Sequence, residues 1–125
     1  MTTNEKILLV QLILEDIKNN WSSGWFGHDV EERASKAKSL CEEIAKELND
    51  NQYLRLAKSC TNYINTGRQK YEWNGSFFEQ PFPKGFENMD ELHNLPHTYK
   101  DKSEEFQMIA EEYLIYPEDS FKDWD

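Results

Sequence analysis

The sequence predicts an all-α protein, a small bundle of about four helices in a single domain over residues 1–125. Apolar residues recur at steps of three and four over several long stretches, which is typical of helices packed on one face. No stretch shows the convincing alternation of a half-buried strand. With 38% hydrophobic residues, 5 glycines and 4 prolines, the composition suits a compact core and is too apolar for a disordered tail.

The first helix is predicted over about residues 4–20. Thr2 and Glu5 have the spacing of a capping box at its start. The apolar residues that follow cover more than half of its circumference: Ile7, Leu8, Val10, Leu12, Ile13, Leu14 and Ile17. A helix that is apolar nearly all round is usually central, so we expect the other helices to pack around it.

The next two helices, about residues 29–48 and 51–71, are predicted to form an antiparallel hairpin. The first carries one apolar stripe: Val30, Ala34, Ala37, Cys41, Ile44 and Leu48. The second carries a matching face: Tyr53, Leu56, Ala57, Cys60, Tyr63 and Ile64. Cys41 and Cys60 are symmetric about the turn at 49–51, so we expect them to be buried neighbours with free thiols. Gly67 disfavours the last turn of the second helix, so an end at that residue is the alternative.

A long irregular aromatic connection is predicted over residues 73–100, which hold every proline except Pro117. A connection of this length in a compact domain is usually functional. The fourth helix is predicted over about residues 101–116, beginning near Asp101 or Ser103 and stopped by Pro117. Its apolar residues are Phe106, Ile109, Ala110, Tyr113 and Leu114.

The charge of the chain is −10 and is concentrated in its second part. Residues 1–73 carry a net charge of −1, whereas residues 74–125 carry −9 and 10 of the 17 aromatic residues. A surface this negative repels phosphate backbones and anionic lipids, which argues against direct nucleic-acid or membrane binding. Acid mixed with aromatics instead suits an interface with a basic protein partner. The alternative is that the acids keep the protein soluble and the aromatics pin the connection to the core.

The candidate partner-binding residues therefore lie in this second part. The candidate aromatic anchors are Phe77, Phe78 and Phe82. The candidate charged contacts are Glu79, Glu87, Asp90, Glu91, Glu104, Glu105, Glu111 and Glu112.

No catalytic, cofactor-binding or metal site is predicted. His93 and His97 have metal-ligand spacing, but Pro96 between them disfavours a helix. The adjacent glutamates of the helices point about 100° apart and are expected to form solvated faces. The glycines are scattered, so no phosphate-binding loop is predicted. A cytoplasmic location with reduced thiols is expected, because the chain shows no secretory leader and its two cysteines fit no disulfide scaffold.

Small size, acid and aromatics concentrated over residues 74–125 and the lack of a catalytic motif together resemble the small acidic bacterial immunity proteins. The resemblance is one of type. It implies a protein that binds a cognate basic toxin of the nuclease class and occludes its active or substrate-binding site. The alternatives from other classes are a non-catalytic helical adaptor, an acidic DNA mimic and an enzyme.

Overall fold

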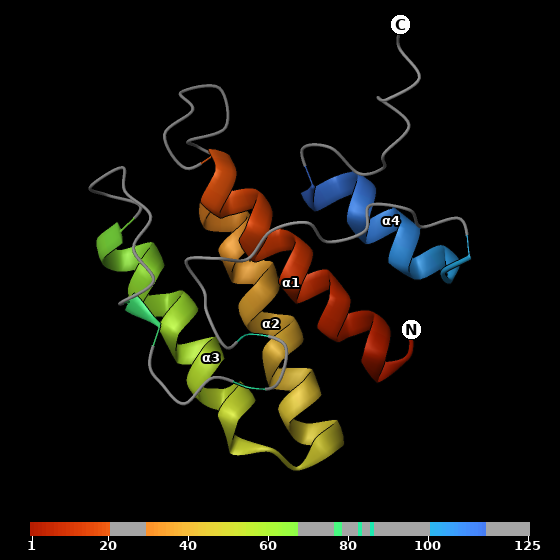
Figure 1. Ribbon diagram of the computed structural model, residues 1–125, viewed down its shortest axis with the longest axis horizontal. Coiled ribbons are helices and arrows are strands. Elements are labelled where there is room, and N and C mark those ends of the chain that lie inside the picture. The colour runs from red at the N-terminus through yellow and green to blue at the C-terminus, as the bar shows by residue number, and fades with distance from the viewer. Residues whose placement is uncertain (21–29, 68–76, 79–82, 84–85, 87–100, 115–125) are drawn as a thin grey trace, which may run out of the picture.

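The computed structural model describes residues 1–20, 30–67, 77–78, 83, 86 and 101–114, and the described part of the chain is helical, without strands (Figure 1). Three helices follow one another up, down and up: α1 (Thr3–Asn20), α2 (Val30–Leu48) and α3 (Asn51–Asn62). The shorter α4 (Glu104–Tyr113) packs against α1 and α2, on the side away from α3. These observations confirm the predicted all-α bundle.

Helix α1 contributes a large set of fully buried apolar side chains to the core. Its start has the predicted capping box: the Glu5 N–H donates to Thr2 Oγ1 at 3.1 Å, and the Thr2 N–H donates to Glu5 Oε1 at 2.9 Å. Six of its apolar side chains are 0% exposed: Leu9, Val10, Leu12, Ile13, Leu14 and Ile17. Helix α1 is thus buried as expected, but it packs mainly on α2 and α4, and the helix that packs against α1, α3 and α4 is α2; the expectation that the other helices surround α1 is therefore corrected.

Helices α2 and α3 form the predicted antiparallel hairpin. Asn49 enters the turn with a φ of 53°, and the Asp50 side chain caps α3 by accepting from the Gln52 N–H at 2.9 Å. Cys41 and Cys60 are buried with free thiols, as predicted, and each side chain is 0% exposed. Leu48, predicted to lie on the apolar stripe, is instead 49% exposed at the end of α2, next to the turn.

An aromatic segment, here the described residues Phe77, Phe78, Pro83 and Phe86, runs back along α3. Phe78 stacks on Tyr63, just after α3, with ring centroids 6.2 Å apart. Phe86 makes an edge-on contact with Tyr53, in the first turn of α3, at 6.3 Å. Phe78 and Phe86 are buried in the core, so this part of the predicted irregular connection covers the hairpin. The rest of residues 73–100 lies outside the described residues.

One predicted helix end is corrected, whereas the end predicted at residue 71 lies outside the described residues. The helix predicted to reach residue 71 is α-helical only to Asn62 and continues as a π-helical turn, Tyr63–Gly67. Residues 68–71 lie outside the described part. The helix predicted over residues 101–116 spans only Glu104–Tyr113, because Ser103 is its N-cap and Leu114 already has extended backbone, with φ −102° and ψ 141°.

Candidate functional site

The outward side of α4 forms an acidic face. Its exposed residues are Glu104, Glu105, Met108, Glu111 and Glu112. Their spacing places them together on one side of an α-helix, while Phe106 and Ala110 on the opposite side are 0% exposed in the core. The amphipathic pattern of α4 therefore turns its glutamates to solvent. We call these five residues the α4 acidic face.

Met108 lies at the centre of the α4 acidic face and is 63% exposed. The four glutamates precede and follow it by three and four positions, so all four are its neighbours on the helix surface. A flexible thioether side chain suits an adaptable contact surface. An exposed apolar residue within a ring of carboxylates combines a contact for an apolar recess with electrostatic steering of a basic partner.

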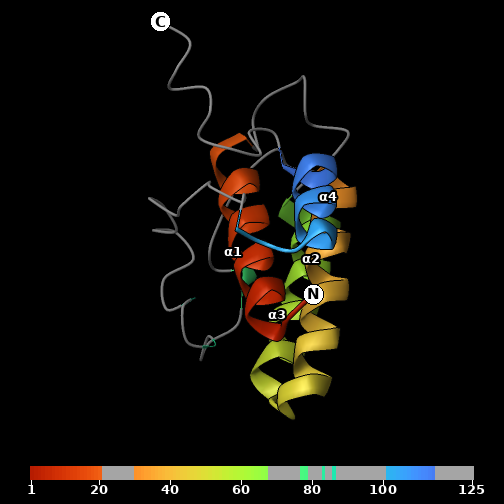
Figure 2. The same ribbon diagram turned by 90° about the vertical axis from the view of Figure 1, so that its right-hand side faces the viewer.

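A groove of about 690 Å³ lies beside the α4 acidic face, between α4 and the first half of α2. It is lined by Glu31, Glu32, Ser35, Lys36, Ser39, Glu112 and Tyr113. We call it the α2–α4 groove. Figure 2 shows α4 lying alongside this part of α2. Through Glu31 and Glu32, the groove adds two carboxylates of α2 to the glutamates of α4.

A lysine and an aromatic ring meet in the α2–α4 groove. The Lys36 Nζ atom lies 5.6 Å from the centroid of the Tyr113 ring, within the range of a cation–π contact. Burial raises the pKa of the Tyr113 hydroxyl, and the negative charges of Glu112 and Glu32 raise it further. Carboxylates from both helices therefore act on the same ring.

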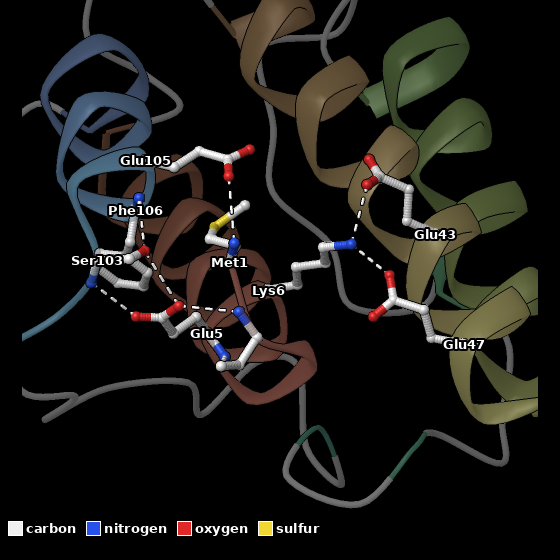
Figure 3. Close-up of polar contacts among 9 residues, drawn as sticks. Met1, Glu5, Lys6, Glu43, Glu47, Ser103, Glu105 and Phe106 are labelled. Carbon is white, nitrogen blue, oxygen red and sulfur yellow. Dashed lines mark hydrogen bonds and ion pairs between the residues drawn. The ribbon is translucent and has the colours of Figure 1, made fainter.

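The start of α4 is tied to the start of α1 by polar contacts (Figure 3). Glu5 accepts from the Ser103 backbone N–H at 2.9 Å and from its hydroxyl at 3.1 Å. These contacts, the backbone bond first, lower the pKa of the Glu5 carboxyl. The terminal ammonium of Met1 lies 3.2 Å from Glu105 Oε2. Helix α4, which carries the acidic face, is thus joined to α1, and α1 is itself anchored in the core.

The same end of α1 is tied to the end of α2. Lys6 pairs with Glu43, with Nζ and Oε1 3.1 Å apart, and with Glu47. The Thr3 hydroxyl donates to Glu47 Oε1 at 2.6 Å. The hydrogen bond to Glu47 is the main cause that raises the pKa of Lys6, and the same bond lowers the pKa of Glu47. These contacts stabilise the packing of α1 on α2. None of the residues that make them lines the α2–α4 groove.

The predicted partner-binding residues differ in where the structure places them. Glu104, Glu105, Glu111 and Glu112 are brought together, exposed, on one helix face. Phe78 is only 3% exposed, so its prediction as a surface anchor is corrected: the ring already packs on Tyr63. Phe77 is partly buried against the same core. The remaining predicted contacts, Glu79, Phe82, Glu87, Asp90 and Glu91, lie outside the described residues.

Several residues of the candidate surface were not singled out from the sequence. No functional role is predicted from the sequence for Met108, Ser35, Lys36, Glu31 or Glu32, and Tyr113 is predicted only as an apolar residue of its helix. A usable signal was present, because Glu31, Glu32, Ser35, Lys36 and Ser39 recur at the spacing of one helix face. The spacing does not show which other helix packs beside this face.

The described residues hold no group of three or more His, Cys, Asp or Glu side chains that could bind a metal ion. Among the helices described, none is long and apolar enough to cross a bilayer. Comparison of the chain with protein-family models, with curated proteins and with solved structures finds no match. The function must therefore be inferred from the α4 acidic face and the α2–α4 groove themselves.

Proposed function

We propose that this protein binds a basic protein through the α4 acidic face and neutralises it, in the manner of an immunity protein acting on a cognate nuclease toxin. The observation that carries the proposal is the arrangement of Met108, 63% exposed, among four exposed glutamates on one helix face. An exposed side chain of this size in a ring of like charge adds nothing to the core. It suits a partner surface with a recess bordered by lysine and arginine.

The mechanism is occlusion. A nuclease binds its substrate through a cleft of basic residues that contact phosphates. The carboxylates of the α4 acidic face would occupy the positions of those phosphates, while Met108 fills an apolar recess. Opposite charges accelerate encounter and make association fall as ionic strength rises. No catalytic group is needed on the inhibitor for this mechanism.

The adaptor alternative is less well supported by the described surface. An adaptor for neutral partners calls for an apolar groove, whereas the α2–α4 groove is lined by carboxylates, serines, a lysine and a tyrosine. Exposed leucines at the hairpin end, Leu48 and Leu54, each 49% exposed, are single apolar residues of a kind normal on protein surfaces. Acidic recognition is therefore the preferred hypothesis.

The test is protection of cells from the product of the neighbouring gene. Immunity proteins are encoded beside their toxin, so the adjacent gene of the source genome is expressed with this chain, and growth and nuclease activity are measured. Wild type is compared with Glu104→Lys/Glu111→Lys. One control is Glu42→Lys, which reverses a single carboxylate at an exposed position of α2 outside the groove lining, and the other is Glu42→Lys/Lys46→Glu, which alters two such positions without changing the net charge. We expect wild type and both controls to protect and the α4 variant to fail.

Inhibition of the nuclease should also be measurable with purified proteins. Wild type should inhibit the nuclease at equal molar amounts, and association with the α4 variant should be slower by about ten-fold or more at low salt. A neighbouring product that is not toxic, or protection that is unchanged in the α4 variant, would contradict the proposal.

A further inference from the structure

The α2–α4 groove has features that the acidity of α4 alone does not explain. Its volume of about 690 Å³ lies within the range of sites that hold small ligands or short peptide segments. The groove is open to solvent, so its lining side chains are accessible to a partner. Two helices that are far apart in the sequence build its walls, with Glu31 and Glu32 on one side and Glu112 on the other.

The groove already holds a cation of its own. The Lys36 ammonium lies over the Tyr113 ring at 5.6 Å, and the negative charges of Glu32 and Glu112 act on the same tyrosine. An aromatic face with carboxylates beside it attracts a cation more strongly than either element does alone. Lys36 therefore marks the position in the groove that a cation occupies, over the ring of Tyr113.

The geometry points to the α2–α4 groove as the receptor for an arginine side chain on an extended basic segment of the protein partner, which takes the place of Lys36 over Tyr113. This inference rests on the proposed function. An arginine suits the site better than a lysine, because its planar guanidinium stacks on an aromatic face and donates two parallel hydrogen bonds to a carboxylate. Ser35 and Ser39 on the wall of the groove provide hydroxyls for the backbone of the segment.

The exchange has a defined energetic basis. The Lys36 ammonium is a flexible, strongly hydrated group on the same helix as the groove wall, so it leaves the ring with little loss. A guanidinium that replaces it keeps the cation–π contact and adds hydrogen bonds to Glu32 or Glu112. Removing the Lys36 charge should therefore improve binding of an arginine, because it removes a competitor.

The test uses a capped hexa-arginine peptide and a capped hexalysine peptide, titrated into the whole protein at low ionic strength by calorimetry. The decisive comparison is Lys36→Met against Lys46→Met. Both substitutions remove one positive charge from α2, but Lys46 is exposed and does not line the groove. We expect Lys36→Met to tighten hexa-arginine binding by about five-fold more than Lys46→Met does. Wild type should also bind hexa-arginine more tightly than hexalysine.

A second variant removes the ring without changing charge. Tyr113→Leu should weaken hexa-arginine binding by about five-fold, whereas Tyr113→Phe, which keeps the aromatic face, should bind like wild type. If Tyr113→Leu fails to fold, as judged by its circular dichroism, the lysine comparison and Tyr113→Phe still decide the question.

Equal effects of the two lysine substitutions, with no preference for arginine, would mean that the peptide responds only to net charge, and this would overturn the inference. That failure would leave the proposed function standing, because the growth test depends on Glu104 and Glu111, which do not line the groove. Conversely, arginine selectivity in the groove together with a failed growth test would separate a basic-peptide site from toxin neutralisation.

Discussion

Glu5 and Ser103, 98 positions apart in the sequence, join the starts of two helices through one carboxylate. Glu5 accepts from the N–H of Thr2 in its own capping box and from both the N–H and the hydroxyl of Ser103. The Ser103 oxygen in turn accepts from the Phe106 N–H at 3.3 Å and caps α4. One side chain thus satisfies donors at two helix starts. This contact joins the start of α4, which carries the acidic face, to the start of α1.

Glu5→Gln should remove a stabilising contribution that depends on pH. The folded-state pKa of Glu5 is lowered from its ordinary value of 4.5, mainly by the Ser103 N–H. The contribution is therefore fully present above that value and is lost as pH falls through the lower folded pKa. Because the carboxylate is partly exposed to solvent, the loss in the variant should stay below about 1 kcal/mol at neutral pH. Urea denaturation of both proteins at neutral pH and at about pH 3 measures it.

The control for this prediction is Glu42→Gln, which changes an exposed carboxylate of the same charge in the interior of α2, away from a helix end. Its unfolding free energy should follow that of wild type at both pH values. A difference between wild type and Glu5→Gln that is as large at about pH 3 as at neutral pH would show that the charge of Glu5 is not the source of the effect.

Charge placed in the centre of α1 should unfold the protein. Leu9 and Ile13 are both 0% exposed, and an unpaired carboxylate at either position costs several kcal/mol against a total stability of about 5–15 kcal/mol. Leu9→Asp and Ile13→Asp should therefore lose the cooperative thermal transition. Glu43→Ala breaks a half-exposed pair with Lys6 and should cost less than about 1 kcal/mol. A charged variant that melts like wild type would remove α1 from the core.

The two thiols of the hairpin should be unreactive in the folded protein. Burial raises the pKa of Cys60 to about 12 and raises that of Cys41 well above its ordinary value. Thiolate is therefore scarce at mildly alkaline pH, and the reagent has no access. Reaction with a disulfide reagent should be slow in native buffer and complete at once in concentrated urea. Rapid modification of either cysteine without denaturant would contradict the described packing.

Local pattern was enough to predict the helices. The capping box at Thr2 and Glu5, the apolar run of α1 and the turn before Asn51 all depend on residues a few positions apart, and all are present. Helix ends were predicted less well, because the π-helical turn from Tyr63 and the early end of α4 at Leu114 depend on packing that propensity does not describe.

The surface could be predicted only in part. The charge partition located the glutamates of α4, since net charge is a property of sequence. The α2–α4 groove could not be found in this way, because Lys36 and Tyr113 meet through the packing of two helices that no local pattern relates. Phe78 shows the same limit: an aromatic residue in a connection serves a partner or the core equally well until its neighbour, Tyr63, is known.

Phe77 and Phe78, adjacent in the sequence, should behave differently when truncated. Phe78 is 3% exposed and stacks on Tyr63 at 6.2 Å, so Phe78→Ala should destabilise the fold by about 3–5 kcal/mol. Phe77 contacts Tyr63 only at a tilt of 54° and is partly buried. Phe77→Ala should cost about half as much or less, because less of its surface leaves water on folding.

The stability of the two variants is compared by urea denaturation. For each variant, the rate at which the basic partner dissociates is then measured on folded protein. Phe78→Ala should strongly lower the urea concentration at the midpoint of unfolding. The partner should dissociate from the folded fraction of this variant at the wild-type rate. Because Phe77 keeps some surface exposed, only its truncation can speed dissociation directly. A normal midpoint for Phe78→Ala combined with faster dissociation would restore Phe78 as a surface anchor and would contradict its place in the core.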